Sequence, residues 1–295
     1  MDDNFKIPEI LNLARKQLAD FGFDSSRADA ELILSFVLNC SRSDLYLKQD
    51  HLKSKEKKRF EELLKRRVLG EPVQYLTNRA YFFGLEFYVE PGVLIPRPET
   101  EILVQTVLDR VRPLLCPEHQ AQDQACILDI GAGAGNISIA LTKNQVSCKI
   151  ATIDISKKAI DIGLKNAKKH NVGSCIEFRC FDCDNLKLLL AKEQLKLIVS
   201  NPPYIPSEDI DLLDKEVRRE PRIALDGGGD GLKFYCPIIK QAGIYLKVHG
   251  CLVLEIGQDQ AEDVTALIQQ TGRFEDIEVI QDLNQRDRVV LAKRL

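Results

Sequence analysis

The segment Asn201-Pro202-Pro203-Tyr204 stands directly after an apolar run and is the first candidate for a functional site. Two prolines stiffen the chain there, because each ring fixes one backbone angle and removes one N–H donor, so a sheet cannot continue. An asparagine amide and an aromatic ring beside such a rigid corner provide hydrogen-bonding and packing groups. The segment therefore indicates either a clamp for a substrate or an ordinary turn.

A second candidate is the glycine-rich turn in LDIGAGAGNISIAL, residues 128–141. Its glycines, at positions 131, 133 and 135, let the backbone bend and let a ligand approach closely. The helix that follows presents free N–H groups and a partial positive charge, which suit a carboxylate or a phosphate. Asp154 ends the next apolar run, where a carboxylate can accept hydrogen bonds from ribose hydroxyls. These features predict a nucleotide-like cofactor, with an ordinary tight turn as the alternative.

The spacing of the glycines separates two kinds of cofactor. The dinucleotide fingerprint has its last glycine where Asn136 stands here. The observed G-x-G-x-G resembles the first motif of S-adenosylmethionine-dependent methyltransferases, whose cofactor has a carboxylate and an ammonium in place of a pyrophosphate. The resemblance implies that Asp129 approaches the ammonium, and that Asp182 and Cys183, after the third strand, contact the adenine unless they form a solvated turn. It also implies cofactor contacts from the turn itself, Gly131, Ala132, Gly133, Ala134 and Gly135.

Alternating elements must position these residues. From about residue 126 the apolar runs CILDI, CKIATID, CIEFRCFD, LKLIVS and GCLVLEI are each followed by a helical or polar segment, which predicts a parallel sheet with crossover helices. Ligands bind beyond the carboxyl ends of such strands, so Asn201, Gly133 and Asp154 should share one rim. The runs FEDIEVIQDL and RDRVVLAKR predict an antiparallel hairpin on the sheet edge. The alternation predicts an α/β fold, and the resemblance of the glycine motif implies a Rossmann-like class I methyltransferase sheet, with a small N-terminal helical domain before it.

The sequence before the predicted sheet differs in composition and in the spacing of its apolar residues. Helical periodicity and a Ser26–Asp29 cap signal characterise the first 70 residues. Aromatic and β-branched residues between Gly84 and Gly92 predict a short hairpin. We expect a helical substrate-binding domain over 1–72, a hairpin linker over 73–95 and a methyltransferase domain over 96–295.

Composition limits the classes of function. No apolar run is long enough to span a membrane, and MDDNFKIPEI shows neither a secretory signal nor a transit peptide, so we expect a cytoplasmic protein. The net charge of −3 argues against a broad nucleic-acid surface. Residues 51–67 hold eight Lys or Arg against three Glu, either a solvated helix face or a contact with a nucleoprotein partner. No metal site is predicted, because the lone C-x-x-C at Cys180 and Cys183 has no matching pair.

The position of the Asn-Pro-Pro-Tyr corner after the fourth parallel strand resembles that in amino-methyltransferases, which methylate the NH₂ groups of adenine, guanine or glutamine. Such a nitrogen is a poor nucleophile, because its lone pair is delocalised. The resemblance implies that the Asn201 side-chain oxygen and the Pro202 carbonyl accept the two hydrogens, while Tyr204 packs against the planar group. Asn201, Pro202 and Tyr204 are thus the predicted catalytic residues, and Asn201 also borders the cofactor.

Three further stretches concern the methyl acceptor: GEPVQYL (70–76), LIPRPETE (94–101) and REPRIALDGGGDGL (219–232). Together with the corner they resemble the release factor glutamine methyltransferase family, from about Gly70 to the C-terminus. The resemblance implies methyl transfer from S-adenosylmethionine to the side-chain N5 of the glutamine in the GGQ loop of peptide chain release factors, leaving S-adenosylhomocysteine. Arg97 and Glu99 are expected at the pocket mouth with Pro203, or else serve as helix cap and surface charge.

Three other functions are weighed against this one. An adenine-N6 or guanine-N2 methyltransferase for DNA or RNA would need a basic recognition region, for which only 51–67 is a candidate. A binding protein without catalysis would not need Asn201 and Asp154 together with the glycines. An NAD-dependent oxidoreductase is disfavoured by Asn136. We expect release factors as partners, no stable nucleic-acid partner, no membrane association and a monomer.

Overall fold

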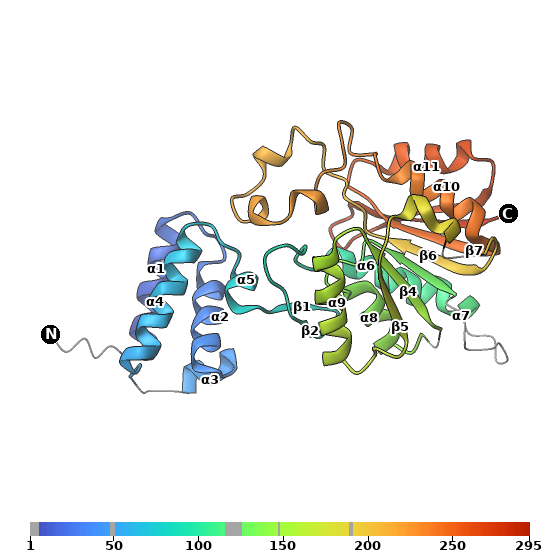
Figure 1. Ribbon diagram of the computed structural model, residues 1–295. Helices are drawn as coiled ribbons and strands as arrows, with labels where there is room; N and C mark the ends of the chain where they lie inside the picture. The colour runs from blue at the N-terminus through green and yellow to red at the C-terminus, as the bar shows by residue number, and fades with distance from the viewer. Residues whose placement is uncertain (1–5, 48–50, 116–125, 147, 189–190) are drawn as a thin grey trace. The chain divides into compact units, whose positions relative to one another are not determined.

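The structure, a computed structural model, describes residues 6–47, 51–115, 126–146, 148–188 and 191–295. The chain divides into two compact units (Figure 1). The helical unit comprises Met1–Arg79 and Asp214–Arg219, and the sheet unit comprises Ala80–Leu213 and Glu220–Leu295. Among the described residues, no helix combines the length and the apolar character needed to cross a membrane. The domain limits expected at 72 and 95 stay predictions.

The helical unit packs its helices around one apolar core. The first helix begins where the Glu9 carboxylate accepts the Lys6 N–H at 2.9 Å, and its buried residues recur at helical spacing. Leu18, Ile33 and Phe60, from three different helices, belong to the same core cluster. The helices are α1 (Ile7–Asp20), α2 (Ser26–Leu38), α3 (Arg42–Leu47), α4 (Ser54–Val68) and α5 (Val73–Thr77).

A buried arginine joins the later segment Asp214–Arg219 to these helices. Arg67 is 1% exposed, and its Nε donates to Asp29 Oδ2 at 2.7 Å. Its guanidinium also pairs with Glu216 at 2.5 Å and lies 4.1 Å from the ring centroid of Phe23. Burying a guanidinium is costly unless charges and hydrogen bonds compensate it, and here two carboxylates do so. Arg67 is therefore the buried charge that connects Asp29 of α2 with Glu216 of the later segment.

Removing this charge should destabilise the helical unit. Arg67→Met leaves the buried Asp29 carboxylate with the Ser25 hydroxyl as its side-chain donor among the described residues and should lower the free energy of unfolding by about 3–5 kcal/mol. The double variant Arg67→Met/Asp29→Leu should recover part of that loss, because no unpaired charge remains. Urea unfolding followed by circular dichroism measures both. Equal losses in the single and double variants would show that packing, not charge, is what Arg67 provides.

The sheet unit is built on a seven-stranded sheet with the order β5-β4-β3-β6-β7-β9-β8. The first five strands in this order are parallel, and β9 runs antiparallel to both β7 and β8. The predicted mostly parallel sheet with an antiparallel C-terminal hairpin is thus confirmed. The strands are β3 (Ile127–Ile130), β4 (Ile150–Asp154), β5 (Ile176–Cys180), β6 (Leu195–Ser200), β7 (Leu246–Glu255), β8 (Phe274–Gln281) and β9 (Asp287–Arg294).

Both faces of the sheet are covered by helices (Figure 1). Successive residues of β6 point to opposite faces, because a strand has a period of two: Leu197 and Val199 join one core cluster and Ile198 the other. The first cluster includes side chains of α6 and α8, and the second those of α10 and α11. The helices are α6 (Thr100–Thr106), a π-helical turn (Val107–Val111), α7 (Arg112–Leu115), α8 (Asn136–Lys143), α9 (Lys157–Lys169), α10 (Tyr235–Tyr245) and α11 (Ala261–Gln270).

Short elements complete the sheet unit. Ala80–Phe82 (β1) and Leu85–Phe87 (β2) pair antiparallel as a hairpin, which lies inside the expected linker over 73–95 but begins before Gly84, the start of the cluster from which it was predicted. In the main sheet, Ile130 stands opposite both Ile153 of β4 and Ser200 of β6. The carboxyl ends of these three strands therefore meet at one edge, which is where the predicted site residues follow. Short 3₁₀ helices cover Cys183–Leu188, which is kinked at Asn185, Ile210–Leu212 and Arg222–Ala224 in this unit and Val217–Arg219 in the helical unit.

Candidate active site

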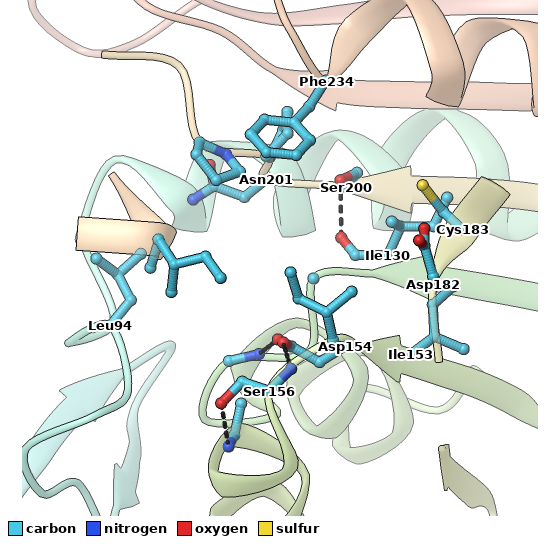
Figure 2. Close-up of a pocket in the computed structure, with 18 of the residues that line it drawn as sticks. Leu94, Ile130, Ile153, Asp154, Ser156, Asp182, Cys183, Ser200, Asn201 and Phe234 are labelled. Carbon is cyan, nitrogen blue, oxygen red and sulfur yellow. Dashed lines mark hydrogen bonds between the residues drawn. The ribbon is translucent and has the colours of Figure 1, made fainter. Parts of the chain in front are cut away.

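A pocket of about 350 Å³ lies beyond the carboxyl ends of β3, β4 and β6. Its volume is within the range of small-molecule sites, roughly 300–1,000 Å³. Figure 2 shows Asp154 and Asn201 on opposite sides of this pocket, with Phe234 beside Asn201. The pocket brings together most of the residues predicted from the sequence: Gly131, Gly133, Asp154, Asp182, Cys183, Asn201, Pro202 and Pro203.

The glycine turn and Asp154 hold each other in place. Asp154 Oδ2 accepts the N–H of Gly133 at 3.0 Å, and Oδ1 accepts the N–H of Ser156 at 2.8 Å (Figure 2). Burial raises the pKa of Asp154, while these two hydrogen bonds oppose that rise. Each carboxylate oxygen keeps a further lone pair for a ligand. Gly135, with φ of 79°, lies outside the pocket wall, and a Cβ there would be 3.3 Å from the Gly163 backbone, so it serves packing.

Asp129 does not line the pocket, although an approach to the cofactor ammonium was expected. It is 1% exposed, within β3, and its Oδ2 accepts the Ser138 hydroxyl at 2.5 Å. Burial raises the pKa of Asp129 to about 7, although the hydrogen bonds of Ser138 lower it. The side chain is thus directed to the start of α8 rather than to the rim. Ala132 and Ala134 are likewise buried and outside the pocket wall.

The Asn-Pro-Pro-Tyr corner is anchored to its neighbours by side chains. Ser200, the last residue of β6, donates its hydroxyl to the Ile130 carbonyl at 2.7 Å (Figure 2). The Asn201 side chain donates through Nδ2 to Thr100 Oγ1 at 3.0 Å. Because the amide nitrogen is used in this way, the side-chain oxygen is the acceptor that Asn201 offers elsewhere. No described residue donates a hydrogen bond to that oxygen.

Tyr204 contacts groups behind the pocket wall and is not part of that wall. Its hydroxyl donates to Glu255 Oε1 at 3.4 Å, and its carbonyl accepts Gln260 Nε2 at 3.0 Å. The glycine-rich segment after the corner packs closely here: a Cβ on Gly231, whose φ is 76°, would lie 2.4 Å from the Tyr204 carbonyl oxygen. Gly227 and Gly231 therefore permit a close approach of this segment to the backbone of Tyr204.

Arg97 and Glu99 also stand outside the pocket wall. Arg97 pairs with Glu220, which is 5% exposed and also accepts the N–H of Ile95 at 2.9 Å. This pairing links LIPRPETE to REPRIALDGGGDGL, although 123 positions separate the two partners. Glu99 is exposed. Their predicted contact with a substrate stays a prediction.

Several wall residues were missed by reasoning from the sequence. The apolar ones carry no chemical signal, because their place depends on how loops fold over the sheet edge. Outside the wall, Thr100, which binds Asn201, lies within LIPRPETE, and Glu255, which accepts the Tyr204 hydroxyl, lies near the end of the fifth predicted strand, so the sequence position of both was informative. The missed wall residues include Gly92, Val93, Leu94, Phe181, Pro221, Ile223, Ala224, Lys233, Phe234, Pro237 and Ile238.

Comparison with known proteins agrees with this geometry. The fold is similar to that of a methyltransferase from Pyrococcus furiosus, with a TM-score of 0.50 at 15% sequence identity over 72% of this chain and 90% of that one. Sheet order, crossover helices and the position of the pocket define a class I methyltransferase fold. Residues 9–77 match the PrmC N-terminal domain, and residues 99–230 match the methyltransferase small domain.

Full-length relatives identify the family. A release factor glutamine methyltransferase from Geobacter sulfurreducens is 39% identical over 287 residues, which is 96% of this chain and 95% of that protein. The one from Chlorobaculum tepidum is 36% identical over 291 residues, 96% of each chain. The chain belongs to the release factor glutamine methyltransferase family. The resemblance inferred from the motifs is confirmed.

The buried Asp129 predicts a pH dependence of stability. In the folded chain its carboxyl keeps a proton up to about pH 7, whereas its ordinary pKa is 3.8, so the free energy of unfolding falls as pH rises through this window. Asp129→Asn cannot titrate. The free energy of unfolding of the variant should therefore rise relative to that of the wild type, by roughly 1 to 3 kcal/mol, as the pH is raised from about 4 to about 8. Urea unfolding across that window tests this; parallel curves for the two proteins would contradict it.

Proposed function

We propose that this protein transfers a methyl group from S-adenosylmethionine to the side-chain N5 of the glutamine in the GGQ loop of peptide chain release factors, and that S-adenosylhomocysteine and one proton from the amide are released. One observation carries the proposal: Asn201, with its amide nitrogen bonded to Thr100, lines the same pocket as Asp154 and the glycine turn. Membership of the release factor glutamine methyltransferase family supports glutamine, rather than a nucleic-acid base, as the acceptor.

The pocket residues fit S-adenosylmethionine. Both carboxylate oxygens of Asp154 are oriented by backbone N–H groups and keep lone pairs that can accept hydrogen bonds from ribose hydroxyls. A Cβ at Gly133 would meet nothing within 4 Å, so the glycine turn leaves open space for a ligand. Asp182 and Cys183 line the same wall and are assigned to the adenine, while Gly131 is assigned to the methionine portion. When bound, S-adenosylmethionine supplies an electrophilic methyl group on its sulfonium.

The corner would position the carboxamide of the substrate. The Asn201 side-chain oxygen and the Pro202 carbonyl accept the two N–H groups of glutamine, which fixes the plane of its amide and directs the nitrogen into the pocket. Both acceptors lie on a stretch with two prolines, so little freedom is lost when the substrate binds. Because an amide nitrogen is a weak nucleophile, this positioning is the main contribution of the protein. Tyr204 keeps the corner in place through its hydroxyl and carbonyl.

The remaining roles concern recognition of the substrate. Glu99 and Arg97, together with Pro203, are assigned to the peptide around the glutamine, and the helical unit to other parts of the release factor. The net charge of −3 supports a protein substrate over a stable nucleic-acid partner. We further propose that the protein is a cytoplasmic monomer.

Methyl-labelled S-adenosylmethionine distinguishes the acceptors. Incubated with this protein, a release factor should gain label, while the same factor with the GGQ glutamine changed to alanine should gain none. DNA and RNA serve as the matched alternative substrates. Label on nucleic acid, or equal label on the altered factor, would overturn the proposed function.

Replacing Asn201 should lower the turnover rate without changing the affinity for S-adenosylmethionine. Asn201→Ala should lower kcat on the order of 100-fold or more, because the glutamine amide loses its orientation. The Kd for S-adenosylmethionine, measured by calorimetry, should stay within about twofold of the wild type. Asn284→Ala, in the exposed turn between β8 and β9, is the control. A large loss of cofactor affinity would instead place Asn201 in the cofactor site alone.

A further inference from the structure

Asn166 of α9 is a fully buried asparagine whose amide binds three backbone groups. Its Oδ1 accepts the N–H of Tyr88 at 2.7 Å. Its Nδ2 donates to the carbonyl of Tyr88 at 3.0 Å and to that of Ala134 at 2.9 Å. An asparagine amide has two N–H donors and one oxygen acceptor. Only this orientation of the amide suits all three partners, because both carbonyls need a donor and the N–H needs an acceptor.

The three hydrogen bonds join two segments that border the pocket. Ala134 belongs to the glycine turn and follows Gly133, which lines the pocket. Tyr88 begins the segment 88–95, here called the wall segment, because its residues 92–94 line the same pocket and its Leu94 is shown there in Figure 2. Asn166 does not line the pocket. It therefore connects the glycine turn with the wall segment from behind.

The wall segment is held by buried side chains at both ends. Asn166 binds its first residue, and Glu220, which is 5% exposed, accepts the N–H of its last residue, Ile95, at 2.9 Å. Between these ends, a Cβ on Gly92 would lie 3.2 Å from Lys158 Cγ, so the segment also packs against the start of α9. The residues that line the pocket thus lie between two anchors, neither of which is part of the pocket wall.

The same helix orients the carboxylate of Asp154. Ser156, the residue before α9, donates its N–H to Asp154 Oδ1 at 2.8 Å, and its hydroxyl oxygen accepts the N–H of Ala159 at 3.3 Å. The start of α9 therefore holds Asp154, and its later residue Asn166 holds the glycine turn and the wall segment. Three parts of the pocket are placed relative to one another through a single rigid helix.

We propose that Asn166 is a positioning residue for the cofactor, which fixes the spacing between the glycine turn and the wall segment and so determines the affinity for S-adenosylmethionine. Asn166 itself touches no ligand. Without its amide, a buried carbonyl and a backbone N–H lose their partners, and the wall segment can move away from the turn. This inference rests on the assignment of S-adenosylmethionine to the pocket, and not on the identity of the methyl acceptor.

Calorimetric titration with S-adenosylhomocysteine tests this role without any methyl acceptor. Asn166→Asp replaces the NH₂ group by an oxygen that faces two carbonyls, and Asn166→Ala removes all three hydrogen bonds. Both variants should raise the Kd by more than about tenfold. A partly unfolded sample lowers the stoichiometry and leaves the Kd of the folded molecules unchanged, so the titration separates positioning from a loss of stability.

Asn144 provides the matched control, because its Nδ2 also donates to a backbone carbonyl, that of Ala140, at 2.8 Å. It follows the last residue of α8 and lies outside the pocket wall. Asn144→Asp and Asn144→Ala should keep the Kd within about twofold of the wild type. A wild-type Kd in both Asn166 variants would overturn the proposal. A wild-type protein that binds S-adenosylhomocysteine but does not methylate the release factor would instead refute the proposed acceptor alone.

Hydrogen exchange in the wild type tests the same connection without a substitution. If the molecule binds the cofactor poorly when the contact between Tyr88 and Asn166 is open, a saturating ligand must suppress that opening. With S-adenosylhomocysteine the Tyr88 amide should therefore exchange more than about tenfold more slowly. The Asn144 amide, which donates to Ala140 at the end of α8, should change by less than about twofold. Tyr88 slowed no more than Asn144 would overturn the proposal.

Discussion

The parallel pairing of β3 with β4 and β6 is the constraint on which the site depends. Because Ile130 stands level with Ile153 and Ser200, the chain leaves three strands at one height. The residues that follow, among them Asp154 and Asn201, must then meet, although Ser200 stands 70 positions after Ile130 along the chain. No side-chain contact between the cofactor side and the substrate side is needed to bring them together.

Loops that are not connected by strand pairing complete the pocket, and polar side-chain contacts hold these loops in place. The Arg97–Glu220 pair joins the segment before α6 to the segment after the corner, and Gln260 donates to the carbonyls of both Tyr204 and Gly231. These interactions are buried or half-buried, where removing one partner leaves the other without compensation. The position of these segments beside the pocket thus depends on side-chain contacts and not on the pairing of strands in the sheet.

Much of this arrangement could be predicted from the sequence, for identifiable reasons. Alternating apolar runs determine a parallel sheet, and its carboxyl edge determines where Gly133, Asp154 and Asn201 meet. The direction of an individual side chain was less predictable. Asp129 precedes the glycine turn, yet its carboxyl group bonds to Ser138 at the start of α8, because its direction depends on the pleat of β3 and not on its distance from the turn. The motif thus predicted that Asp129 lies beside the glycine turn, but it did not predict that Ser138 is its hydrogen-bond partner.

The two carboxyl groups that burial brings to a pKa of about 7 show why such contacts matter. Asp129 bonds to a serine within the core and lies outside the pocket wall, so its proton affects stability. Glu255 has a similar pKa, but it accepts the hydroxyl of Tyr204 at 3.4 Å, so a change of its proton alters a contact of the corner that carries Asn201. Burial thus raises the pKa of both groups alike, and the partners that each strand places beside the carboxyl group decide which part of the molecule the proton affects.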